Sequence, residues 1–100
     1  MAFDMYADDL HEIIGNGEEF LLELASQTKE IYPELDRLNS AFWDDPTVDN
    51  ERAGLIVHEL IDLLERHGNS DPNLTRIIGR LLPFFSKVFC RSYVIRCKSD

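Results

Sequence analysis

Apolar and polar positions follow their most regular pattern between residues 50 and 67. Apolar side chains recur there every three or four positions with polar side chains between them, which is typical of an amphipathic helix with one buried face. Asp49 precedes this segment as a suitable N-cap, and Gly68-Asn69 follows it as a stop signal. The side chains that we expect on the buried face are Ala53, Ile56, Leu60, Leu63, Leu64 and His67.

Three charged residues of this helix, Glu59, Asp62 and Arg66, are expected on its solvent side. Asp62 and Arg66 lie four positions apart with the acid first, a spacing that favours an ion pair worth about 0.3 kcal/mol. Charged side chains on that side would keep it in contact with water.

A second amphipathic helix is expected from residue 72 to residue 89. Asp71 would cap it, and Pro72 would occupy its first position, where the N–H that proline lacks is not needed. Pro83 lies inside the pattern and is expected to kink the helix or cut it in two. The apolar face of this helix comprises Leu74, Ile77, Ile78, Leu81, Leu82, Phe85, Val88 and Phe89.

The N-terminal half predicts shorter helices. Asp8 and Asp9 could begin a brief helix that ends at Gly15-Asn16-Gly17. Residues 18–32 then keep the spacing of one buried stripe, and Pro33 is well placed to begin a further short helix. The stripe contains Phe20, Leu21, Leu24, Thr28, Ile31 and Tyr32, and it continues with Leu35, Leu38 and Phe42.

The two ends of the chain favour strands. Residues 3–6 and 93–97 alternate apolar and polar side chains, and the second segment is rich in β-branched and aromatic residues. The sequence therefore predicts a mainly α fold in a single helical domain over residues 1–100. We expect a small bundle of four to five helices, to which the terminal segments could add a short two-stranded β element.

Charge narrows the classes of function more than composition does. Hydrophobic residues make up 44% of the 100 residues and charged residues 29%, as in an ordinary globular protein. The formal net charge of −9 repels phosphate backbones and anionic lipids, which argues against a nucleic-acid or membrane partner. The first 51 residues carry 14 acids and two bases (net −12), whereas the other 49 carry five acids and eight bases (net +3). We therefore expect an acidic face built mainly from the N-terminal half.

Nothing in the sequence predicts export or membrane insertion. The first residues lack the pattern of a signal peptide, and no run approaches the roughly 18 apolar residues of a membrane span. Cys90 and Cys97 are too few for a disulfide scaffold, and their spacing matches no common zinc or redox motif. We expect reduced, structural thiols in a cytoplasmic protein that is not an enzyme and holds no cofactor or metal.

Two segments resemble chemical motifs without completing them. His58-Glu59 begins like the zinc motif H-E-x-x-H, but Asp62 stands where the second histidine is required. The acids and the histidine between residues 8 and 12 lack the regular offsets and the central glycine of a calcium loop. A small metal-dependent hydrolase that uses His58, Glu59 and Asp62 stays open as an alternative class.

The strongest candidate is a protein-binding surface around Phe42-Trp43-Asp44-Asp45. This stretch places two large aromatic side chains beside two acids on an expected loop. Interface hot spots favour tryptophan, and carboxylates around it can steer and hold a basic partner. Phe42 is expected in the core, whereas Trp43 could serve the core or a partner. The residues that we expect to contact a partner are Trp43, Asp44, Asp45, Asp49 and Glu51.

The layout of residues 33–100 resembles that of small acidic bacterial immunity proteins. The resemblance lies in Pro33-Glu34-Leu35, in Trp43-Asp44-Asp45, and in a capped helix that holds Glu59-Leu60. It continues with a helix led by an Asn-Leu pair, in which Leu82-Pro83-Phe84-Phe85 precedes a terminal strand. The chain departs from the pattern before that strand, because residues 89–92 contain none of the glycines expected there.

Such immunity proteins neutralise the toxins of polymorphic-toxin and contact-dependent growth inhibition systems. The resemblance implies a cytoplasmic inhibitor without catalysis and a cognate toxin domain that is often a basic nuclease. Inhibition would occur by occlusion, with carboxylates on a rigid scaffold occupying a cationic cleft of the toxin.

A regulatory adaptor or self-associating helical subunit is the alternative. Four bulky side chains within six residues, Phe84, Phe85, Val88 and Phe89, are difficult to bury on one helix of a small domain. They could extend an apolar face to a second copy of the chain. The expected oligomeric state is therefore a monomer or a weak homodimer.

Overall fold

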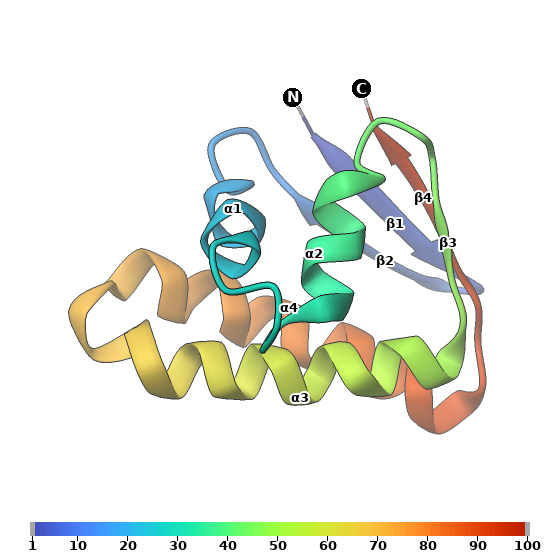
Figure 1. Ribbon diagram of the computed structural model, residues 1–100. Coiled ribbons are helices and arrows are strands. Elements are labelled where there is room, and N and C mark those ends of the chain that lie inside the picture. Colours follow the sequence, from blue (N-terminus) through green and yellow to red (C-terminus); the bar gives the residue numbers. More distant parts are fainter. Residues whose placement is uncertain (1, 100) are drawn as a thin grey trace.

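The computed structural model describes residues 2–99, which form an α+β domain. Within these residues, a four-stranded antiparallel sheet and four α-helices surround one core (Figure 1). The elements are β1 (Phe3–Ala7), β2 (Leu10–Ile14), α1 (Phe20–Ser26), α2 (Pro33–Ser40), β3 (Thr47–Val48), α3 (Asn50–His67), the 3-10 turn η1 (Gly68–Ser70), α4 (Pro72–Arg91) and β4 (Ile95–Ser99). The prediction of a mainly α helical bundle is wrong, because the sheet forms one wall of the core.

The sheet brings the two ends of the chain together. Its strand order is β2-β1-β4-β3, and β1 pairs with β4 from Phe3 opposite Ser99 to Tyr6 opposite Arg96. Alternate side chains of β1 point into the core, where Phe3 and Met5 are fully buried. The expected contact between the terminal segments is thus present inside a larger sheet, although β4 begins at Ile95 rather than at residue 93.

The brief helix expected after Asp8 is instead the second strand of a hairpin. Asp8 and Asp9 form the two-residue turn between β1 and β2, and Asp8 adopts a positive φ of 57°. Aspartate tolerates this conformation better than most residues, so the two acids favour a turn at this position. The β-branched Ile13 and Ile14 favour a strand after the turn.

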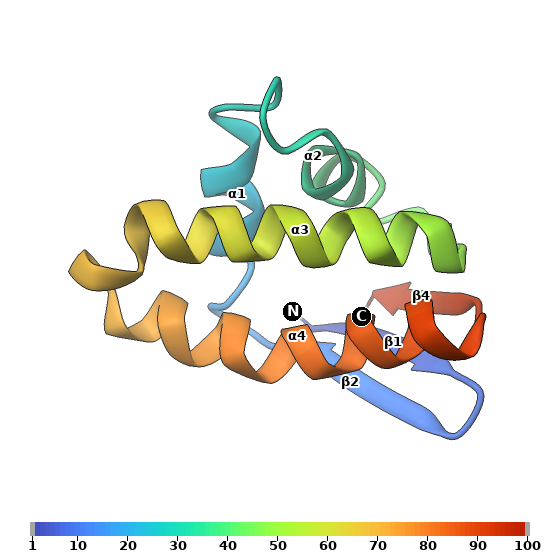
Figure 2. The same ribbon diagram turned by 90° about the horizontal axis from the view of Figure 1, so that it is seen from below.

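The two long helices follow the sequence patterns closely. α3 and α4 lie side by side (Figure 2), and each begins at an aspartate cap. Asp49 Oδ1 accepts the N–H of Arg52 at 2.8 Å, and Asp71 Oδ1 accepts the N–H of Leu74 at 3.1 Å. α4 is not cut at Pro83: it continues to Arg91, because several side chains on either side of the proline are buried in the core.

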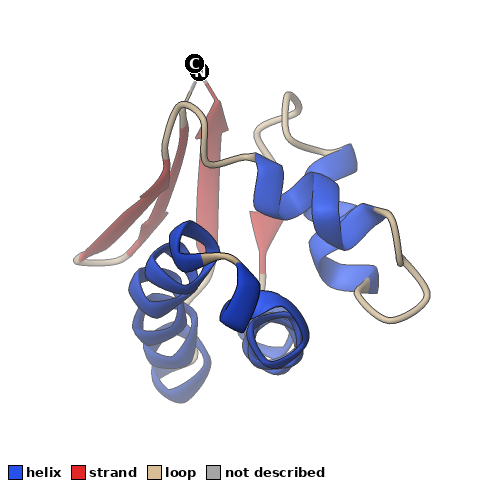
Figure 3. Cartoon of the chain, turned by 90° about the vertical axis from the view of Figure 1, so that its left-hand side faces the viewer, coloured by secondary structure: helices blue, strands red, loops and turns tan. Residues whose placement is uncertain are grey.

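The N-terminal helices are shorter than the apolar stripe predicts. α1 ends at Ser26, and the chain passes through turns before α2 begins at Pro33. Ile31, expected on the buried stripe, is 38% exposed, whereas Tyr32 is buried. The core lies between the sheet, the α3–α4 pair and the α1–α2 pair (Figure 3).

α4 ends in a Schellman motif without glycine. The N–H of Tyr93 donates to the carbonyl of Val88 at 3.0 Å, and the N–H of Ser92 donates to the carbonyl of Phe89 at 3.3 Å. Ser92 takes the left-handed conformation, with φ 57° and ψ 39°, that this motif requires. Within residues 2–99, no helix is both long enough and apolar enough to cross a membrane.

Candidate functional site

Trp43 is an aromatic side chain that faces solvent and packs on one side against the core. It is 58% exposed, and its ring packs edge-on against Phe42 with the centroids 5.4 Å apart. Phe42 is buried and stacks on Phe3 of β1 at 4.6 Å. The expectation that Phe42 belongs to the core is confirmed. Phe42 therefore supports one side of the Trp43 ring, and the rest of the ring is exposed to solvent.

A groove of about 240 Å³ opens beside Trp43. It is lined by Glu19, Glu23, Asn39, Phe42 and Trp43, so it lies between α1, α2 and the turn that follows α2. Asn39, which lines the groove, donates from Nδ2 to Ser26 Oγ at 3.1 Å and so connects α2 to α1. We call this site the Trp43 groove.

The Trp43 groove carries two uncompensated carboxylates. Glu19 and Glu23 lie four positions apart, and Glu19 Oε2 accepts the N–H of Gly17 at 3.0 Å. Among residues 2–99, neither forms an ion pair with a lysine or arginine. Like charges at this spacing repel each other, so a cation between them would relieve the repulsion. Asp44 follows Trp43 and is also exposed.

The other predicted contact residues do not share this groove. Asp45 Oδ1 accepts the N–H of Ser99 at 3.1 Å and so holds the end of β4. Asp49 is occupied as the N-cap of α3. Glu51 lies exposed on α3 and lines a different groove, beside Phe89. Of the five predicted residues, the structure therefore places only Trp43 together with Glu19 and Glu23 in this groove.

Sequence reasoning missed Glu19 and Glu23. Their spacing shows that they share one face of a helix, but nothing in the sequence indicates that Trp43 lies opposite that face. The contact between α1 and α2 depends on the turn at residues 27–32, whose path no periodicity describes.

Part of the expected acidic face is neutralised by arginines from the C-terminal half. Arg80 binds Glu18 through two contacts, Nη2 to Oε1 at 2.6 Å and Nη1 to Oε2 at 3.1 Å. Its Nε lies 3.1 Å from Glu12 Oε1. The hydrogen bonds from Arg80 hold the pKa of Glu18 below its ordinary value, against the opposing effect of burial. The negative surface is therefore narrower than the charge count suggests.

A second arginine from the C-terminal half compensates α2. Arg52 Nε binds Glu34 Oε1 at 2.8 Å, and Glu34 is buried. Arg37, from the same helix, adds a longer contact to Glu34 Oε2 at 3.4 Å. Glu34 is thus unavailable to a partner.

Glu59 was expected on the solvent side of its helix, and this prediction is wrong. Its side chain is buried, Oε2 accepts the N–H of Glu34 at 3.0 Å, and Oε1 accepts the N–H of Leu35 at 2.9 Å. Glu59 of α3 therefore caps the N-terminus of α2. Burial raises the pKa of Glu59, and the two backbone hydrogen bonds oppose that rise.

Asp62 is also engaged in the fold. It forms the predicted ion pair with Arg66, with Nε and Oδ2 2.8 Å apart, and accepts the hydroxyl of Tyr32 at 2.6 Å. Burial, followed by this hydrogen bond to Asp62, raises the pKa of Tyr32 to about 12. His58 is exposed, whereas Glu59 turns to α2. No group of three metal-ligating side chains occurs in the described part of the chain.

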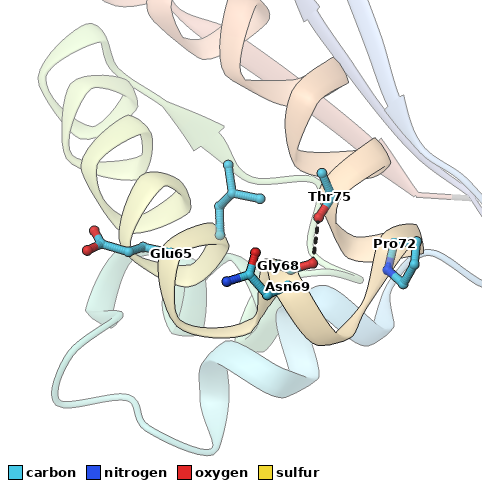
Figure 4. Close-up of a pocket in the computed structure, with 6 residues that line it drawn as sticks. Glu65, Gly68, Asn69, Pro72 and Thr75 are labelled. Atoms are coloured by element: carbon cyan, nitrogen blue, oxygen red, sulfur yellow. Dashed lines mark hydrogen bonds between the residues drawn. The ribbon is translucent and has the colours of Figure 1, made fainter.

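A wide depression lies at the turn between α3 and α4 (Figure 4). Its volume is about 650 Å³, and it is lined by Leu64, Glu65, Gly68, Asn69, Pro72 and Thr75. The hydroxyl of Thr75 donates to the carbonyl of Gly68 at 3.0 Å, which closes the turn. Glu65 contributes its sole carboxylate, so the depression lacks the convergent polar groups typical of a ligand site.

The four bulky side chains of the alternative self-association surface belong mostly to the core. Phe84, Phe85 and Val88 are buried, and only Phe89, 49% exposed, reaches the surface. Its ring lies over Gly54, where an added Cβ would approach Phe89 Cδ1 to 2.6 Å. Of the four side chains, only Phe89 is therefore accessible to a second copy.

Comparison of the chain with protein-family models, curated proteins and solved structures finds no match. The function must therefore be inferred from the geometry of the Trp43 groove and the charge around it.

Proposed function

We propose that this protein is a cytoplasmic, non-catalytic inhibitor that binds a basic protein domain through the Trp43 groove. The partner in this proposal is a cognate toxin domain of a polymorphic-toxin or contact-dependent growth inhibition system. The observation that carries the proposal is an exposed Trp43, packed edge-on against the buried Phe42, beside Glu19 and Glu23, which lack basic partners in the described chain. Neither nucleic acid nor a membrane is part of it.

The groove suits a cationic side chain of such a partner. An arginine or lysine placed on the face of Trp43 would gain a cation–π contact and the attraction of both carboxylates. Asp44 and the net charge of −9 would add long-range attraction and speed the encounter with a basic domain. A toxin whose cationic substrate cleft is occupied in this way could not bind an anionic substrate.

The mechanism needs only a rigid surface. α1 and α2 are fixed to each other by Asn39 and Ser26, and α2 is fixed to α3 by Glu59. Preorganised side chains lose little conformational entropy on binding, which favours tight inhibition.

The test first identifies the partner, as the product of the neighbouring reading frame or by a pull-down from the native host. It then measures the affinity of that partner by calorimetry and its toxic activity in the complex. We expect Trp43→Ala to weaken binding roughly 30-fold, the effect of losing about 2 kcal/mol at a hot spot. Glu19→Gln/Glu23→Gln should lower the association rate and its dependence on salt. Glu51→Gln/Glu65→Gln removes the same net charge from α3, so it should lower the association rate less than Glu19→Gln/Glu23→Gln does. Ile61→Ala changes an exposed apolar residue of α3 and should leave binding unchanged.

Two results would contradict the proposal. An active toxin in a saturated complex would exclude inhibition by occlusion. Full affinity in Trp43→Ala, or an equal loss in Ile61→Ala, would place the interface outside the Trp43 groove.

A further inference from the structure

β2 forms one open margin of the sheet. It pairs with β1 on one side and is the first strand in the order β2-β1-β4-β3. Ala7 opposite Leu10 closes the two-residue turn, so the backbone groups of His11 and Ile13 point away from β1. An edge strand with such groups is a template for pairing with another chain.

Side chains occupy both outward backbone groups of Ile13. The carbonyl oxygen accepts Arg80 Nη2 at 2.8 Å, and the N–H donates to Glu12 Oε1 at 3.0 Å. At His11, by contrast, the described chain offers no partner for either group. On this edge of β2, only the outward N–H and carbonyl of His11 are therefore left for pairing with another strand.

Arg80 is held firmly over this edge. Glu18 binds it at 2.6 Å and 3.1 Å, and Glu18 Oε1 also accepts the N–H of Gly15 at 2.8 Å. The Nε of Arg80 is buried and is not aligned for a hydrogen bond, although Glu12 Oε1 lies 3.1 Å away. The hydrogen bonds to Glu18 and to the Ile13 carbonyl therefore fix the guanidinium over β2.

We infer that Arg80 and Glu12 mask the edge of β2 against antiparallel pairing with a second copy of this chain. Two copies related by a two-fold axis at Glu12 would place His11 of each opposite Ile13 of the other, so both rungs would be self-complementary. The mask removes the Ile13 groups from that pairing, because the outward N–H and carbonyl of Ile13 are already hydrogen-bonded to Glu12 and Arg80. The surface is thus a latent homodimer interface, separate from the Trp43 groove.

The test compares molar mass at increasing protein concentration for folded variants. Glu12→Val/Arg80→Met removes both masking groups, and we expect its mass to rise toward that of a dimer. The wild type and Arg76→Met should stay monomeric, because Arg76 contacts Glu18 at 3.7 Å but does not contact β2. Adding His11→Pro should restore the monomer, since proline cannot donate at the edge. A monomeric double variant, or a dimer that persists with His11→Pro, would overturn the inference.

Amide hydrogen exchange tests the mask in the wild type without any substitution. The N–H of Ile13 should exchange more slowly than that of His11, because only the first is hydrogen-bonded. Equal exchange at the two positions would show that the edge is not masked, whatever the variants do.

Discussion

Glu59 supplies from α3 the cap that α2 lacks in its own sequence. Tyr32 precedes α2 and makes no capping hydrogen bond, and Pro33 has no N–H to satisfy. The next two N–H groups, of Glu34 and Leu35, both donate to Glu59. One carboxylate therefore satisfies the orphan donors of a neighbouring helix and fixes the two helices together.

Replacing Glu59 should lower the free energy of unfolding more than its charge suggests. We expect Glu59→Ala to cost about 2 kcal/mol, because two buried N–H groups lose their acceptor. Glu59→Gln should cost less, since it keeps one acceptor oxygen. Urea unfolding measures both, with the exposed Glu65→Ala as the control on the same helix. A cost for Glu59→Ala no greater than that of the control would show that the cap contributes nothing.

The sequence spacing places Glu59 on the buried face of α3, but it does not show that Glu59 caps α2. It lies three residues after Ile56 and four before Leu63, which is the spacing of the buried stripe. The charge led to the prediction of a solvent position, as it does correctly for Glu65. Glu59 is buried because α2 packs over it, and no local sequence pattern predicts that contact.

Ser92 ends α4 in the left-handed conformation, a position that glycine usually occupies. Its left-handed φ of 57° costs a residue with a Cβ roughly 1–2 kcal/mol, and glycine recovers this at an entropic cost of about 0.5–1 kcal/mol. We expect Ser92→Gly to stabilise the protein by about 0.5 kcal/mol in thermal unfolding. Ser92→Ala keeps the Cβ and should give no gain, and equal effects of the two would contradict this account.

At the scale of elements, the long amphipathic patterns predicted the helices well, whereas the short patterns succeeded at the chain ends and at Pro33 but failed after Asp8. α3 has the predicted bounds, because an 18-residue segment contains enough turns to fix its period. The five residues of β2 contain too few positions to distinguish a strand from the start of a helix, so Asp8-Asp9 was assigned to a cap rather than a turn. The Trp43 groove depends on such short elements, which is why only part of it was predicted.

The packing of α3 on α4 predicts opposite results for two glycines. Gly79 of α4 has open space around it, so Gly79→Ala should stabilise the helix by about 1 kcal/mol. At Gly54 of α3 the added Cβ would meet the ring of Phe89 at 2.6 Å, which should cancel or reverse that gain. Chemical denaturation of both variants checks the contrast.

The control for this contrast removes the ring. In a Phe89→Ala background, Gly54→Ala should recover the gain seen at Gly79, because the space opposite is then empty. If Gly54→Ala stabilises the wild type as much as Gly79→Ala does, the ring of Phe89 does not pack against Gly54.

At the scale of the whole molecule, charge serves the fold as well as recognition. The charge count predicted a single acidic face, yet arginines from the C-terminal half neutralise part of it. Arg52 pairs with Glu34, and Arg80 pairs with both Glu12 and Glu18. Sequence position could not show this, because 62 residues separate the partners Glu18 and Arg80. The carboxylates of the Trp43 groove stay outside these networks, which narrows the candidate site to one end of the α1–α2 pair.

The two internal carboxylates with shifted pKa values should act on stability in opposite directions. Burial raises the pKa of Glu59 above its ordinary value of 4.5, so its contribution is greatest below 4.5 and falls as pH rises through the folded pKa. Hydrogen bonds from Arg80 lower the pKa of Glu18, so its contribution is present above 4.5 and is lost as pH falls through the lowered pKa.

Urea unfolding across pH separates the two effects when each variant is subtracted from the wild type. The stability difference from Glu59→Gln should grow as pH falls from neutral toward 4.5, because only the wild type takes up a proton at Glu59 on folding. The difference from Glu18→Gln should stay constant over that range and shrink below it. Subtraction cancels the titration of the exposed acids, which both proteins share. If the stability differences of the two variants change with pH in the same way, Glu59 and Glu18 do not have pKa values shifted in opposite directions.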